Sequence, residues 1–134
     1  MAADFNIDIA LENKDYALFS SVKDIKYLQS ILNFKNWGFV LDFKSAWKAK
    51  STPLEYAKVM GKRLLFSHVS FRNFNATEFG INFEYQDRDV IDAIEFLNKH
   101  SSKNMFILET TGAQTFSEIK KSQKELELMV NGSN

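Results

Sequence analysis

The sequence predicts an α/β protein built from four strand–helix units around a parallel sheet. Four short apolar runs have the character of strands, within residues 5–13, 38–43, 63–70 and 104–110. Each run is followed by a segment in which apolar residues recur at the spacing of an amphipathic helix. The repeating unit is roughly thirty residues long, the size of a strand with its crossover helix. Strict alternation of this kind is typical of parallel strands joined by right-handed crossovers.

The first predicted strand, FNIDIALEN at 5–13, alternates between two faces. Its large apolar residues share one face, at Phe5, Ile7, Ile9 and Leu11. The other face ends in a carboxylate, and each of the other three strands also carries an ionisable side chain at or near its end. These four side chains are Glu12, Asp42, His68 and Glu109.

The predicted helices have clear start signals. Three of them begin with the spacing of a capping box, at Ser21 with Asp24, Thr52 with Glu55, and Thr115 with Glu118. Pro53 also suits the first position of its helix. The remaining helix is predicted from Asp87 to about Lys99. We expect a loop at 44–51 and a long segment without helical periodicity at 71–86.

Composition narrows the class of protein. The chain has 134 residues, which predicts a single domain over 1–134. It contains no cysteine, so disulfides, thiolate nucleophiles and zinc–thiolate sites are excluded. Its formal net charge is zero, which gives no general attraction to nucleic acid or to an acidic membrane surface. Without a membrane-length apolar run or a signal peptide, we expect a cytoplasmic protein.

The four ionisable strand ends predict a metal site. In a parallel sheet the carboxyl ends of all strands lie at one edge, where α/β proteins place their chemistry. The alternation puts all four side chains on the same face, so they converge if the sheet curves. Three carboxylates and one imidazole suit Mn²⁺ or Mg²⁺, with Zn²⁺, Co²⁺ or Fe²⁺ also possible. The ligands would be Glu12, Asp42, His68 and Glu109.

Longer motifs around these residues carry a resemblance. The segments IALEN, GFVLDFKSAW with TPLEYAK, RLLFSHVS and FILET together resemble strands five to eight of a xylose isomerase-like TIM barrel. This superfamily contains sugar (phosphate) isomerases and epimerases and the endonuclease IV group. The resemblance covers essentially the whole chain and implies half of a (β/α)₈ barrel. It also implies one divalent metal on the same four side chains, with Glu12 and Glu109 as the acid–base pair.

The implied reaction is proton transfer on a sugar or sugar phosphate. The metal would polarise a carbonyl and hydroxyl pair, and the two glutamates would remove and return a proton. Arg72 lies near the position of a substrate-binding arginine in the epimerases, and Trp47 is a candidate for stacking on a sugar ring, although packing explains it better. The endonuclease branch would need more metal ligands than the sequence has, and we expect no nucleic-acid partner.

Two positions depart from the family pattern. Ser45 stands where a histidine usually follows the aspartate, and Phe71 stands where an acidic or polar residue is common. These departures favour a second hypothesis, a catalytically inactive assembly module that retains the fold.

Half a barrel also leaves the inner sheet face and two edges bare. We therefore expect a homodimer, a separate N-terminal half-barrel, or a sequence that is a piece of a longer protein.

Overall fold

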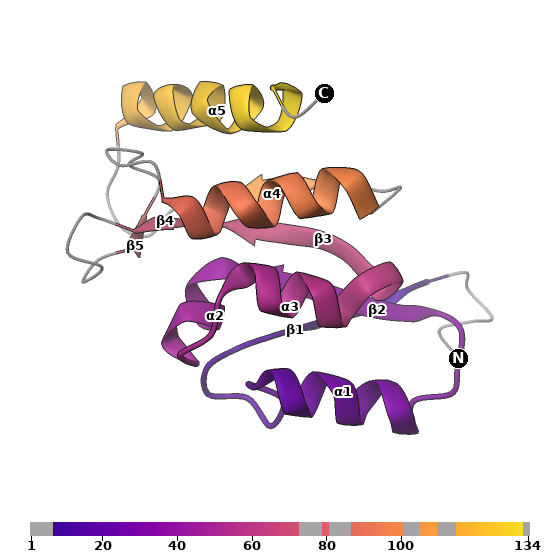
Figure 1. Cartoon of the computed structure of the whole chain (residues 1–134). Coiled ribbons are helices and arrows are strands. Elements are labelled where there is room, and N and C mark those ends of the chain that lie inside the picture. The colour runs from indigo at the N-terminus through magenta and orange to yellow at the C-terminus, as the bar shows by residue number, and fades with distance from the viewer. Residues whose placement is uncertain (1–6, 73–78, 81–86, 101–104, 110–114, 133–134) are drawn as a thin grey trace.

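The computed structural model describes residues 7–72, 79–80, 87–100, 105–109 and 115–132. Within them, four strands form one sheet in the order β1-β2-β3-β6, and every neighbouring pair is parallel. The strands are β1 (Ile9–Glu12), β2 (Trp37–Asp42), β3 (Leu64–Val69) and β6 (Phe106–Leu108). The predicted α/β class with a parallel sheet is therefore confirmed (Figure 1).

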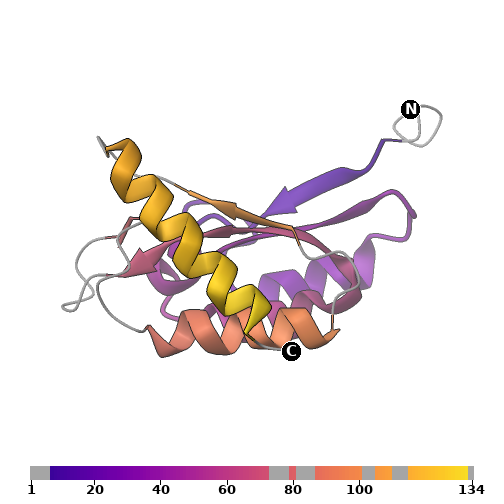
Figure 2. The same cartoon turned by 90° about the horizontal axis from the view of Figure 1, so that it is seen from above.

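The helices lie mainly on one side of this sheet, as the view in Figure 2 shows. They are α1 (Val22–Ile31), α2 (Phe43–Lys48), α3 (Pro53–Met60), α4 (Arg88–His100) and α5 (Phe116–Asn131), with a 3₁₀ turn η2 at Gly61–Arg63. The core fills the space between the helices and one face of the sheet. Its fully buried members include Ile25, Phe39, Leu41, Tyr56 and Met60. None of the described helices is both long and apolar enough to cross a membrane.

The three predicted capping boxes are confirmed. The Asp24 amide donates to Ser21 Oγ over 3.2 Å, and the Glu55 amide donates to Thr52 Oγ1 over 3.2 Å. The third box joins Thr115 to the Glu118 amide at the start of α5. In each box the acidic side chain accepts a hydrogen bond from the amide of the cap residue. Local chemistry thus sets where these helices begin.

The prediction of a loop at 44–51 is wrong for its first half, because Phe43–Lys48 forms the helix α2. The Asp42 side chain caps this helix by accepting a hydrogen bond from the Ser45 amide over 3.0 Å. Phe43 and Ala46 are fully buried in the core. Burial of these two side chains supplies the stability that so short a helix lacks by itself.

Two other boundaries differ from expectation. Within 71–86, Phe71–Arg72 (β4) pairs antiparallel with Phe79–Gly80 (β5), while 73–78 and 81–86 lie outside the described residues. The first strand covers only Ile9–Glu12, and residues 5–6 of its predicted span are also outside the described part.

The register of the sheet determines how the strand ends line up. Asp42 pairs with His68, and His68 pairs with Ile107, so these three residues form one row across the sheet. Glu12 pairs with Val40, which is two residues before Asp42, and therefore belongs to the preceding row on the same face of the sheet. Glu109 lies two residues beyond Ile107, in the row after. All of these side chains are on the face opposite to Phe39 and Leu41, which pack under the helices.

Candidate functional site

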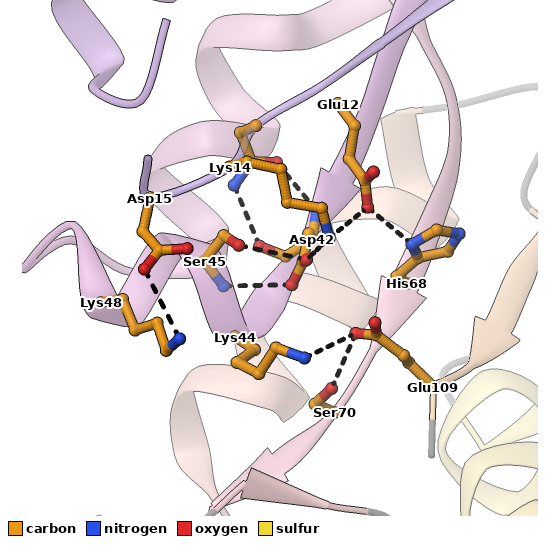
Figure 3. Close-up of polar contacts among 11 residues, drawn as sticks. Glu12, Lys14, Asp15, Asp42, Lys44, Ser45, Lys48, His68, Ser70 and Glu109 are labelled. Atoms are coloured by element: carbon orange, nitrogen blue, oxygen red, sulfur yellow. Dashed lines mark hydrogen bonds and ion pairs between the residues drawn. The ribbon is translucent and has the colours of Figure 1, made fainter. Parts of the chain in front are cut away.

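The candidate site lies at the carboxyl edge of the sheet, where the strand ends meet the residues of α2 (Figure 3). Glu12 ends β1, Asp42 ends β2, His68 is the next-to-last residue of β3, and Glu109 follows β6. Each predicted ligand is therefore supplied by a different parallel strand.

Three of the four predicted ligands belong to one polar network. His68 Nδ1 lies 2.8 Å from Glu12 Oε1, so the imidazole and the carboxylate share a hydrogen bond. The same Glu12 oxygen lies 2.8 Å from the ammonium nitrogen of Lys14. Lys14 also forms an ion pair and hydrogen bond with Asp42 Oδ2. Lys14 thereby joins the Glu12–His68 pair to Asp42.

Asp42 is the most enclosed member of the network, with no exposed side-chain area. Ser45 donates to both of its carboxylate oxygens, from the amide at 3.0 Å and from the hydroxyl at 3.1 Å. Asn13 holds the Asp42 backbone from both sides. Its Nδ2 donates to the Asp42 carbonyl at 3.0 Å, and its Oδ1 accepts from the Asp42 amide at 2.8 Å. The two Ser45 donors thus satisfy oxygens of a side chain that water does not reach.

Lys14 provides the positive charge that these acids need. Partial burial on its own would lower the pKa of the Lys14 ammonium. The hydrogen bonds to Asp42 and Glu12, together with the attraction of both negative charges, outweigh that effect and raise the pKa. Lys14 is therefore a permanent cation at neutral pH, held between two carboxylates.

Glu109 makes different contacts. Its Oε2 lies 3.5 Å from the Lys44 ammonium, and Ser70 Oγ donates to the same oxygen at 3.5 Å. The register explains this separation, because Glu109 stands one row beyond Asp42 and His68. Among the described residues, no group of three or more His, Asp or Glu side chains is arranged to hold a metal ion as it stands.

The two substrate candidates contact each other beside this edge. The Arg72 guanidinium lies over the Trp47 ring, 4.4 Å from its centroid. Arg72 also donates to both oxygens of Asp87 at 2.7 Å and to Asp89 at 2.8 Å. Trp47 Nε1 donates to Asp89 Oδ2 at 3.1 Å. These four residues form a second polar cluster, which couples α2 and β4 to the start of α4.

Sequence reasoning missed two residues that organise the site, Asn13 and Lys14. Both directly follow Glu12, so a signal was present in the polar pair that terminates the first strand. Nothing in their spacing indicates that they reach Asp42, which is 28 residues from Lys14 along the chain. Only the pairing of β1 with β2 brings them together.

Comparison of the chain with protein-family models, with curated proteins and with solved structures gave no match. The resemblance to xylose isomerase-like barrels therefore stays a prediction from the motifs.

Proposed function

We propose that this chain is a half-barrel of the divalent-metal-dependent sugar isomerase or epimerase type, acting on a sugar or sugar phosphate. The observation that carries the proposal is the network at the carboxyl edge of the sheet, in which the Lys14 ammonium joins Glu12 to Asp42 and His68 contacts Glu12. Oxygen and imidazole donors are the ligands of Mn²⁺ and Mg²⁺ sites in proteins.

The fit of a metal depends on Lys14. An ammonium between two carboxylates marks a position where positive charge is favourable, and a divalent ion satisfies the same carboxylates more strongly. The Lys14 side chain is 23% exposed, so its flexible stem has a path toward solvent. Glu12, Asp42 and His68 would hold the ion once Lys14 withdraws, with Glu109 as the fourth ligand that the resemblance implies. When bound, the ion would polarise neighbouring sugar oxygens.

The rows of the sheet support paired glutamates as the acid and base. Glu12 lies one row before Asp42 and His68, and Glu109 lies one row after them. Two carboxylates on either side of a central row suit a substrate carbon held between them. One carboxylate removes the proton from carbon, and the other returns a proton to the same carbon or its neighbour.

A second candidate function is an assembly module without turnover. The favouring observation is that Lys14 already pairs with both Glu12 and Asp42, while Ser45 donates to both Asp42 oxygens. In that case the network stabilises the sheet edge, and Lys14 occupies the place that a metal ion would take.

Mn²⁺ binding separates the two candidates. We would titrate Mn²⁺ by electron paramagnetic resonance into the wild-type protein, Lys14→Met and Lys14→Met/Glu12→Gln. The matched control is Lys48→Met, because Lys48 pairs with Asp15 at 3.5 Å and is 45% exposed. Removing the competing ammonium should tighten Mn²⁺ binding by about tenfold or more, equivalent to about 1.4 kcal/mol. The Glu12 substitution should abolish the gain, and the Lys48 control should equal wild type.

Folding is checked in the same samples by circular dichroism, and Mn²⁺ should raise the Tm of Lys14→Met more than that of wild type. If folded wild type and folded Lys14→Met both fail to bind Mn²⁺, the metal function is wrong and the assembly module is favoured. Turnover is tested directly with D-fructose and D-fructose 6-phosphate in D₂O, where exchange of a carbon-bound proton for deuterium is the expected signal.

A further inference from the structure

The first and last strands of the sheet both have an open edge. The Ile9 amide donates to the Asn36 carbonyl, and the Asn13 amide donates to Val40. Since backbone groups of a parallel strand alternate in direction, those of Ala10 and Glu12 point away from β2. On β6, Met105 and Glu109 bond to β3, so the backbone groups of Phe106 and Leu108 point outward. No other strand of the described residues pairs with either edge.

The side chains at the β6 edge lack the usual protection. Monomeric proteins guard open edges with charges, proline or bulges. Here β6 is the wholly apolar run Phe106–Leu108, and Ile107 is 39% exposed. At the opposite edge, Ile9 is 40% exposed and Ile7 is 56% exposed. A net charge of zero adds no repulsion between copies.

A groove lies beside β6, under α5. It holds about 470 Å³ between β6 and α5, and its apolar lining includes Phe106, Leu108, Ile119 and Leu126. A crossover helix packs over its own strand and the following strand. The helix α5 has no following strand among the described residues, so its inner side and that of β6 are left uncovered.

The exposed apolar side chains of Ile9 in β1 and of Ile7 just before it match the apolar part of this groove in chemistry and in direction. Ile7 and Ile9 share the alternation of Leu11, which packs against the core on the helix side. A strand placed parallel to β6 would direct the same side chains toward the space under α5. An apolar strand with these side chains exposed is present in the chain itself, at the opposite edge of its sheet.

We infer that a second copy of this chain docks its β1 against β6, and that the reciprocal contact closes an eight-stranded parallel barrel. A two-fold axis along the strands keeps every strand pointing the same way and makes both contacts equivalent. It uses all four open edges of the pair, whereas a two-fold axis across the strands would pair β1 with β1 and leave β6 open. The conclusion that this dimer completes the candidate site rests on the proposed function.

Site-specific cross-linking tests the docking. The chain has no cysteine, so single substitutions give one reactive thiol per copy. Ala10→Cys and Ile107→Cys lie on the same sheet face at opposite edges. Differently tagged copies would be co-expressed in pairs and treated with a short bis-maleimide, and the solution mass would be measured by light scattering. Lys58→Cys, exposed on α3, is the control.

The expected result is a mass twice that of the 15.5 kDa chain. A cross-linked dimer should form at least tenfold faster from the Ala10→Cys and Ile107→Cys pair than from either variant with itself or with Lys58→Cys. A monomeric mass across a concentration series, or cross-linking of Ala10→Cys with itself alone, would overturn the docking. If a monomer still binds Mn²⁺ after Lys14→Met, the proposed function survives and only the docking fails. If the protein is a dimer but Lys14→Met binds no Mn²⁺, the docking survives and the proposed function fails.

Discussion

The ammonium of Lys14 lies against the carboxylate of Asp42, whose side chain has no exposed area. The two residues stand on different strand ends and meet only because β1 pairs with β2. Lys14 therefore supplies from within the chain the positive charge that the buried acid requires. Whether the site binds a metal depends on how readily this contact opens.

Removing the ammonium should destabilise the protein. Lys14→Met leaves the buried Asp42 carboxylate without its cation, and we expect a loss of about 2 kcal/mol in the free energy of unfolding. Urea denaturation followed by circular dichroism measures it. Lys48→Met, at an exposed pair, should stay within about 0.5 kcal/mol of wild type. In the double variant Lys14→Met/Asp42→Asn the loss should be smaller than the sum of the two single losses. Equal stabilities of Lys14→Met and Lys48→Met would show that Lys14 stabilises the protein no more than an exposed lysine does.

The same contribution should depend on pH at the alkaline end. The pKa of Lys14 is raised in the folded protein above its ordinary value of 10.5. A raised pKa gives stability that is fully present below the unfolded value and is lost as the pH rises through the folded value. The difference in unfolding free energy between wild type and Lys14→Met should therefore be constant from neutral pH to about pH 9.5 and shrink above pH 10.5. Shrinkage that begins near neutral pH would argue against the ion pairs.

The capping acids should act at the opposite end of the pH scale. Hydrogen bonds from Ser51 and from the Thr52 amide lower the pKa of Glu55 below its ordinary value of 4.5. Thr52→Ala should cost about 1 kcal/mol at pH 7, because the first turn of α3 loses its cap. Ser117→Ala, at an exposed helical position, is the control.

A lowered pKa gives stability that is present above the unfolded value and is lost as the pH falls through the folded value. Glu55→Gln should therefore differ from wild type at pH 7 and approach it below pH 4, as followed by urea denaturation. A difference that is independent of pH would show that the charge of Glu55 does not contribute.

The cluster around Arg72 should contribute more to the stability of the fold than an exposed ion pair of similar geometry. Asp87 is only 3% exposed and accepts two hydrogen bonds from Arg72. Asp87→Asn should cost about 3 kcal/mol, because the Arg72 guanidinium loses the more buried of its two carboxylate partners and keeps only Asp89. The control is Arg88→Gln, which breaks the exposed pair of Arg88 with Asp92 at 2.8 Å and should change stability by less than about 0.5 kcal/mol. Thermal unfolding compares the two variants. Similar losses of stability in both would show that the cluster contributes no more than an exposed ion pair.

Gly38 should tolerate no side chain. A Cβ atom there would lie 2.4 Å from the Arg63 carbonyl oxygen and 2.6 Å from Leu65 Cγ, closer than real contacts allow. Because one neighbour is backbone, the sheet itself would have to shift, and Gly38→Ala should cost about 1–3 kcal/mol. An unchanged urea midpoint would show that β2 and β3 have room for a methyl group at this position.

Local chemistry made part of this structure predictable. The residues of a capping box interact within four positions along the chain. Ser21, Thr52 and Thr115 therefore predict the starts of their helices without tertiary information. The helix α2 was missed because its cap is Asp42, a residue assigned to the strand and to a metal. Its stability also comes from burial of Phe43 and Ala46, which no local pattern reveals.

The alternation of residues along each strand determined by itself which face Glu12, Asp42, His68 and Glu109 occupy, because a strand repeats every two residues whatever it packs against. Tertiary structure alone decided their rows and their partners. The register placed Glu12 and Glu109 on either side of the row of Asp42 and His68. It also brought Lys14 to Asp42, and a charge on a long flexible side chain acquires its partner only when the strands lie side by side.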